Sequence, residues 1–165
     1  MKFARVTIKV GCSWSDRDNA WRELRTALKA VADEVNVRLQ RKLGPKVFPI
    51  GTKAIECSRL RARPGALVLD RIQESMASAD FLLFDISPEK GHEQGKANVL
   101  FEVGIATGIG KRYYLVSNMD YKPNAIPSDL WGLCVAKRKN GRLDASLRAT
   151  LVSDCRKLFI ERNGL

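Results

Sequence analysis

Three polar residues of this sequence have types and a spacing suited to chemistry: Asp85, Asn98 and Glu102. Asp85 ends a continuous apolar run, which is typical of a strand buried on both faces. Asn98 and Glu102 lie four residues apart in a segment with helical spacing, so their amide and carboxylate share one helix face. A carboxylate placed in this way acts as a nucleophile or offsets positive charge that develops on a ligand.

Alternating strands and helices must position these residues. Apolar periodicity predicts strands at residues 5–10, 47–50, 80–86, 113–116 and 133–136, and helices at residues 21–43, 64–76, 98–110 and 144–160. This alternation is typical of a mainly parallel sheet covered by helices on both faces. We therefore expect one α/β domain over residues 1–165, a flavodoxin-like three-layer sandwich whose five-stranded sheet has the order 2-1-3-4-5.

A sheet of this order binds ligands at the carboxyl ends of its strands, where the order reverses between the first and third strands. Two loops meet at that point, residues 11–18 and 87–98. Trp14 in the first loop is a candidate for stacking on a base. Cys12 beside it is expected to be a small buried residue, because no basic partner in the sequence accompanies its thiol.

The charge is unevenly distributed. The chain has 29 Lys and Arg against 18 Asp and Glu, a formal net charge of +11, which favours a nucleic acid or another anionic partner. Residues 1–73 carry 16 basic and 7 acidic residues, residues 111–165 carry 11 and 5, and residues 74–110 carry 2 and 6. The segment with the candidate site is therefore acidic, which a uniformly basic nucleic-acid-binding protein does not require.

Several classes of protein are excluded or disfavoured. No apolar run reaches the ~20 residues that span a bilayer, and the first residues lack the apolar stretch of a secretory signal, so we expect no membrane association. The four cysteines form no CxxC pair and His92 is the single histidine, so no metal site is expected. A reduced, cytoplasmic location is the expectation.

The residues around the candidate site resemble a known family. Residues 79–87 (ADFLLFDIS) and 98–106 (NVLFEVGIA) resemble the nucleoside 2-deoxyribosyltransferases and the related TIR-like nucleotide-binding domains. Residues 126–130 (IPSDL) look like a further piece of the pattern, and residues 11–20 (GCSWSDRDNA) are similar more loosely. The strong match covers residues 78–117.

This resemblance implies that the protein cleaves an N-glycosidic bond in a nucleoside or nucleotide, by deoxyribosyl transfer or by hydrolysis of NAD. Glu102 takes the position of the catalytic glutamate, and Asp85 that of a residue that holds the sugar or assists the departing base. Asn98 orients Glu102 or binds a sugar hydroxyl. NAD enters as a substrate, and no cofactor is implied. Relatives of both kinds associate, so a homo-oligomer is expected.

Further substrate-binding candidates lie at the ends of the two loops. Backbone amides of the turn from Gly11 to Ser13 are suited to hold a phosphate or hydroxyl, and Ser87 belongs to the strand-end motif. The sequence departs from the transferases before the helix. Lys96 and Ala97 stand just before Asn98, and the nearest carboxylates, Glu89 and Glu93, are expected to lie in a long loop. Transfer to an acceptor base is therefore less well supported than bond cleavage.

Other interpretations remain open. Glu102 can be a favourable charge near a helix N-terminus, and Asn98 can be the N-cap of that helix. The whole protein can be a module that senses a nucleotide or recruits a partner without catalysis, since a fold alone does not define an activity. A basic nucleic-acid-binding domain is the second alternative.

Overall fold

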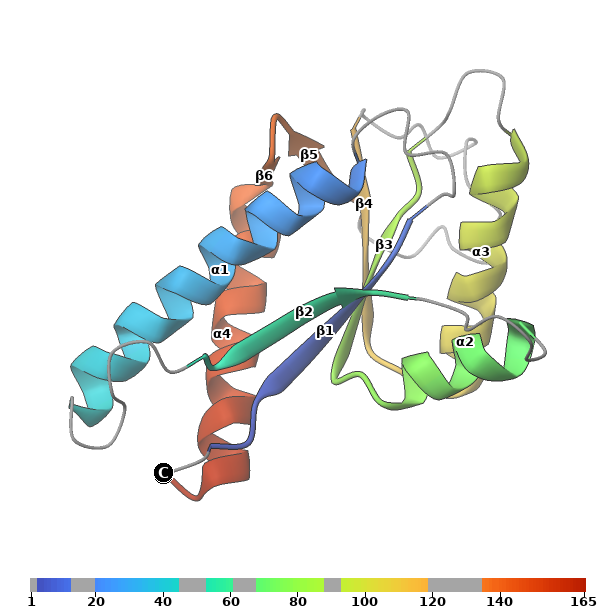
Figure 1. Cartoon of the computed structure of the whole chain (residues 1–165). Helices are drawn as coiled ribbons and strands as arrows, with labels where there is room; N and C mark the ends of the chain where they lie inside the picture. Colours follow the sequence, from blue (N-terminus) through green and yellow to red (C-terminus); the bar gives the residue numbers. More distant parts are fainter. Residues whose placement is uncertain (1–2, 13–19, 45–52, 61–67, 88–92, 119–134) are drawn as a thin grey trace.

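The computed structural model describes residues 3–12, 20–44, 53–60, 68–87, 93–118 and 135–165 (Figure 1). The strands are β1 (Val6–Gly11), β2 (Ile55–Arg59), β3 (Phe81–Asp85), β4 (Tyr113–Ser117), β5 (Val135–Lys139) and β6 (Arg142–Leu143). The helices are α1 (Ala20–Leu43), α2 (Val68–Ala77), α3 (Glu93–Gly108) and α4 (Ala145–Asn163). Among these helices, none is long and apolar enough to cross a membrane.

The strands form one sheet in the order β2-β1-β3-β4-β5-β6, in which the first five are parallel and β6 is antiparallel to β5. The α/β class, the flavodoxin-like sandwich and the order 2-1-3-4-5 are thus confirmed, with a sixth strand at the edge. This strand follows a two-residue turn at Asn140 and Gly141, whose φ angles of 50° and 70° match the hairpin turn that Asn-Gly favours.

The second strand lies further along the chain than the sequence predicts. The predicted strand at 47–50 falls outside the described residues, and the strand that pairs with β1 runs from Ile55 to Arg59. Ile55 pairs with Val6 and is buried, whereas the rest of β2 is only partly covered. This is the exposure expected of an edge strand, and it explains why the segment lacks a strong apolar pattern.

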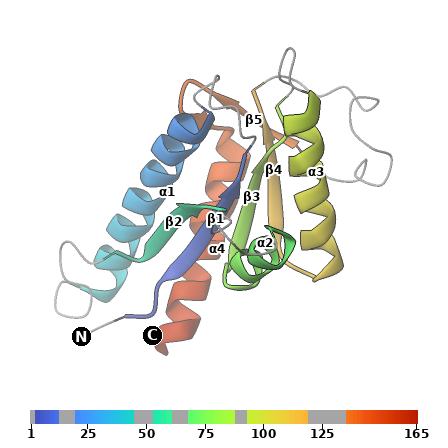
Figure 2. The same cartoon turned by 45° about the vertical axis from the view of Figure 1, so that its right-hand side comes forward.

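Helices cover the two faces of the sheet in pairs (Figures 1 and 2). Helices α1 and α4 contact each other and pack on the face to which β1 presents Val6, Ile8 and Val10. Helices α2 and α3 pack on the other face, where Leu82 and Phe84 of β3 are buried. Strand β3 is buried at all of its residues, as its continuous apolar run predicts.

Helix α3 begins at Glu93, earlier than the predicted start at Asn98. The prediction that Asn98 caps this helix is therefore wrong, because Asn98 lies inside it and is exposed. Glu102 consequently lies in the third turn. The favourable effect of the helix dipole on an anion is confined to the first turn, so it does not explain a carboxylate at Glu102.

Candidate functional site

The Glu102 carboxylate lies against the end of β1. A Cβ atom built on Gly11, the last residue of β1, would lie 2.8 Å from Glu102 Oε2 and 2.5 Å from Cδ1 of Phe84. Only a residue without a side chain leaves room here for both the carboxylate and the ring. Gly11 pairs with Phe84 across the β1–β3 boundary, where the strand order reverses. The structure therefore brings Gly11 and Glu102 together at the predicted ligand-binding edge.

The carboxylate of Glu102 is desolvated. Its Oε2 atom is buried, and it has no hydrogen-bond partner within the part of the chain that the structure describes. Burial raises the pKa of Glu102 from its ordinary 4.5 to about 7. A buried carboxylate without a hydrogen-bond donor costs free energy. Such an arrangement is typical of a functional carboxylate whose partner is a bound ligand.

Asp85, the second predicted catalytic residue, has other partners. Its Oδ1 atom accepts hydrogen bonds from the backbone N–H of Ser87 at 2.9 Å and from the Ser87 hydroxyl at 2.5 Å. Its Oδ2 atom accepts from Nε of Arg138 at 2.6 Å, and Arg138 also donates to Glu23 on α1 at 2.5 Å. The side chains of Asp85 and Arg138 are both 3% exposed, so this ion pair is buried.

The two predicted catalytic carboxylates face opposite sides of the sheet. Side chains alternate along a strand. Phe84 belongs to the α2/α3 side, so Asp85 belongs to the α1/α4 side, where Arg138 links it to Glu23 of α1. Glu102 lies on the α2/α3 side, against Phe84 and Gly11. The structure does not bring Asp85 and Glu102 together, and a catalytic role for Asp85 stays a prediction.

The other predicted site residues are dispersed. Ser87 is buried, and its hydroxyl donates to Asp85 and accepts from the backbone N–H of Asn118 at 2.9 Å. Asn98 is exposed on α3, one turn before Glu102. Ser13 and Trp14 lie outside the described residues. Substrate binding by these four residues stays a prediction.

Arg138 is a buried residue of this region that the sequence did not predict. It stands between Lys137 and Lys139 in a run of charges that indicates a solvated edge, yet it is 3% exposed. The available signal was the alternation of β5, in which Ala136 and Arg138 share one face and Ala136 packs in the α1/α4 core. A charge on a core-facing position requires buried partners, and Asp85 and Glu23 supply them.

The site and the sheet define a class of protein, a flavodoxin-like α/β domain with a buried glutamate at its switch point. No family model matches the chain, and no curated protein matches it either. Among solved structures, it is similar to a 2-desoxiribosyltransferase from Leishmania mexicana, with a TM-score of 0.43 and 13% identity over 84% of this chain and 78% of that one.

Proposed function

We propose that this protein cleaves the N-glycosidic bond of a nucleoside or nucleotide and that Glu102 is its catalytic residue. One observation carries the proposal: the carboxylate of Glu102 is buried without a described partner against Gly11, at the carboxyl edge where β1 meets β3. The resemblance of residues 79–87 and 98–106 to the deoxyribosyltransferases and TIR-like domains supports the substrate class.

A desolvated carboxylate suits this reaction. In its ionised form Glu102 attacks the anomeric carbon, and an ester bond forms as the bond from that carbon to the base nitrogen breaks. The electron pair stays on the base. Nicotinamide leaves NAD as a neutral molecule, whereas a purine or pyrimidine base leaves as an anion and takes a proton from water. The transition state carries positive charge on the sugar ring, and an anion in a site of low polarity stabilises that charge more strongly than one in water.

The second step decides between hydrolysis and transfer. Water that attacks the ester releases the free sugar and regenerates the carboxylate, whereas an acceptor base in place of water gives a new nucleoside. The departure of the sequence from the transferases at Lys96 and Ala97 favours hydrolysis. Both outcomes begin with release of the original base, so base release is the first quantity to measure.

The test is incubation with NAD and with a panel of nucleosides, 2′-deoxynucleosides and their 5′-monophosphates, followed by chromatography for free base. We expect wild-type protein to release base from at least one of them. Glu102→Gln should lower the rate by on the order of 10³-fold or more while the ligand still binds. Glu161→Gln, on the far helix α4, is the matched control.

Two results contradict the proposal. Absence of base release at high protein concentration, together with tight nucleotide binding, identifies a sensing module without catalysis. Tight binding to a generic oligonucleotide that falls steeply with salt, without base release, identifies a nucleic-acid-binding domain.

A further inference from the structure

Arg138 links several parts of the carboxyl edge of the sheet. Its Nε donates to Asp85 at the end of β3, and its Nη1 donates to Glu23 in the first turn of α1 at 2.5 Å. Its Nη2 lies 3.4 Å from the hydroxyl of Ser87. A guanidinium presents its N–H groups in one rigid plane, so it fixes the positions of these acceptors relative to one another.

Ser87 extends this network to the end of β4. Its hydroxyl donates to Asp85, accepts from the backbone N–H of Asn118 at 2.9 Å and receives the longer contact from Arg138. The one hydrogen and both lone pairs of this hydroxyl are therefore in use. The backbone N–H of Ser87 also donates to Asp85, at 2.9 Å. One buried cation is thus linked to residues just beyond the ends of β3 and β4.

The network begins directly behind the Glu102 site. Gly11 lies against the Glu102 carboxylate and pairs with Phe84, the residue before Asp85 on β3. Side chains alternate along the strand, so Asp85 and its partner Arg138 lie on the face of the sheet away from Glu102. Arg138 is therefore placed to support the site from behind and not to touch a ligand beside Glu102.

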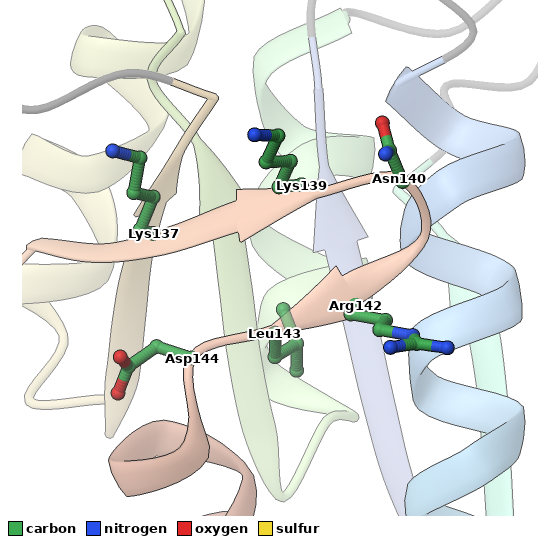
Figure 3. A pocket seen from close by; sticks show the side chains of 6 residues that line it. All are labelled: Lys137, Lys139, Asn140, Arg142, Leu143 and Asp144. Atoms are coloured by element: carbon green, nitrogen blue, oxygen red, sulfur yellow. The ribbon is translucent and has the colours of Figure 1, made fainter.

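The β5–β6 hairpin holds the arginine itself in place. The backbone N–H of Asp144 donates to the carbonyl of Lys137 at 2.7 Å, across the base of the hairpin. Gly141 in the turn lies against Thr26 of α1, and Figure 3 shows the turn at Asn140 beside this helix. The cation is thus carried by a strand that is fixed both to the sheet and to α1.

This network is better suited to hold a geometry than to add stability. The side chains of Arg138 and Asp85 are both 3% exposed, so both charges are removed from water. Loss of one partner alone is costly, but desolvation offsets most of the attraction within the intact pair, and apolar residues of similar volume often stabilise a fold as well. Apolar residues do not supply direction, whereas charged hydrogen bonds hold their groups in one arrangement.

We propose that Arg138 is a positioning residue of the candidate site, which aligns the ends of β3 and β4 with the start of α1 so that the substrate binds beside Glu102. The inference rests on the proposed function for the identity of that substrate. Substrate affinity then depends on a cation that does not touch the substrate. Glu23 is the link best suited to a test, because its side chain is 30% exposed and its removal leaves the pair of Arg138 with Asp85 in place.

The first arm of the test needs no activity. Amide hydrogen exchange is followed by NMR in the full chain, for wild type and for Arg138→Lys, which keeps the charge but has a single nitrogen that cannot hold both carboxylates in the same geometry. We expect the amides of Ser87 and Asn118 to exchange about tenfold faster, relative to the amide of Leu82 near the amino end of β3. Unchanged ratios overturn the inference.

The second arm is the base-release assay at a temperature at which every variant is fully folded. Glu23→Ala should raise KM by about tenfold, with little change in kcat or in the midpoint of the pH profile, because the Glu102 carboxylate is untouched. Glu23→Gln keeps an acceptor oxygen for Arg138 and should restore most of the affinity. A purely structural role would lower the melting temperature and leave KM as in wild type.

Glu34→Ala is the matched control. It removes two ion pairs of the same helix, those with Arg38 and Arg148, about three turns further along α1, and it should keep the wild-type KM. The same KM in wild type and Glu23→Ala, or an equal rise in Glu34→Ala, overturns the inference. If wild-type protein releases no base, the proposed function fails, while hydrogen exchange still decides whether Arg138 orders the strand ends.

Discussion

Substitution of Glu102 by glutamine should change how the stability of the protein depends on pH. Burial raises the pKa of Glu102 from 4.5 to about 7, so between these values the folded state binds more protons than the unfolded state. The free energy of unfolding of the wild type therefore falls as pH rises through this window. Below pH 4.5 the carboxyl is protonated in both states and the penalty is absent. Above pH 7 the penalty is fully developed.

The magnitude follows from the size of the pKa shift. One pKa unit corresponds to 1.36 kcal/mol, so the penalty approaches about 3 kcal/mol above pH 8, and partial exposure of the side chain reduces it to about 2 kcal/mol. Glu102→Gln removes the charge but keeps the shape. The difference in unfolding free energy, variant minus wild type, should thus increase by about 2 to 3 kcal/mol between pH 4.5 and pH 8.

The assay is urea unfolding of both proteins at half-unit steps of pH. Contributions from every other ionisable group cancel in the difference, and any constant cost of burying the glutamine amide shifts the curve without changing its slope. A difference that stays flat across this pH range refutes the reasoning that the Glu102 carboxylate is desolvated in the folded protein.

Glu34 provides a control of opposite sign. Slight burial acts to raise its pKa, but hydrogen bonds from Arg148 and Arg38 outweigh this and lower the pKa overall. Glu34→Gln should therefore lose stability relative to wild type as pH rises through the acid range, and added salt should reduce the effect because the pairs are exposed.

Three further predictions concern the neighbours of this carboxylate. Gly11→Ala forces a methyl group against the buried ring of Phe84 and the Glu102 carboxylate, and should lower the free energy of unfolding by about 1–3 kcal/mol and reduce base release, as measured by urea unfolding and chromatography; unchanged values for both would contradict the packing. Arg138→Met leaves Asp85 buried without its cation and should cost about 3 kcal/mol by urea unfolding, and a loss below about 1 kcal/mol would show that the pair is not desolvated. If Glu102 is the nucleophile, kcat/KM of the wild type should rise with pH below 7 and level off above it, whereas a fall over the same range would assign it as a proton donor.

Much of the fold is predictable because its signals are local. Strand β3 has an uninterrupted apolar run, and α1 buries residues at helical spacing, so both positions follow from the sequence. The carboxyl-edge rule predicts that the loops at residues 11–18 and 87–98 meet, and in the structure Gly11 lies against Glu102 of α3. Both inferences need only the side-chain period of an element and the direction of a parallel sheet.

The remaining features depend on tertiary contacts that no local pattern encodes. The pairing of Arg138 with Asp85 joins residues 53 positions apart. Nothing in the neighbouring sequence distinguishes a buried arginine from an exposed one. The short strand β6 is two residues long, too short for any periodic signal. The edge strand β2 buries little of its surface, so its position depends on pairing with β1 more than on its own apolar residues.

The alternation of β5 also makes this strand sensitive to the alignment of its neighbours. A slip of one residue against β4 would turn Lys137 and Lys139 toward the α1/α4 core and would expose Arg138, leaving Asp85 buried without a counter-charge. The burial of two lysines and the loss of the two ion pairs of Arg138 would then oppose the shifted pairing. The charges of Lys137, Arg138 and Lys139 therefore discriminate between correct and incorrect strand pairing while the chain folds. A single insertion or deletion within β5 should block folding more severely than most point substitutions.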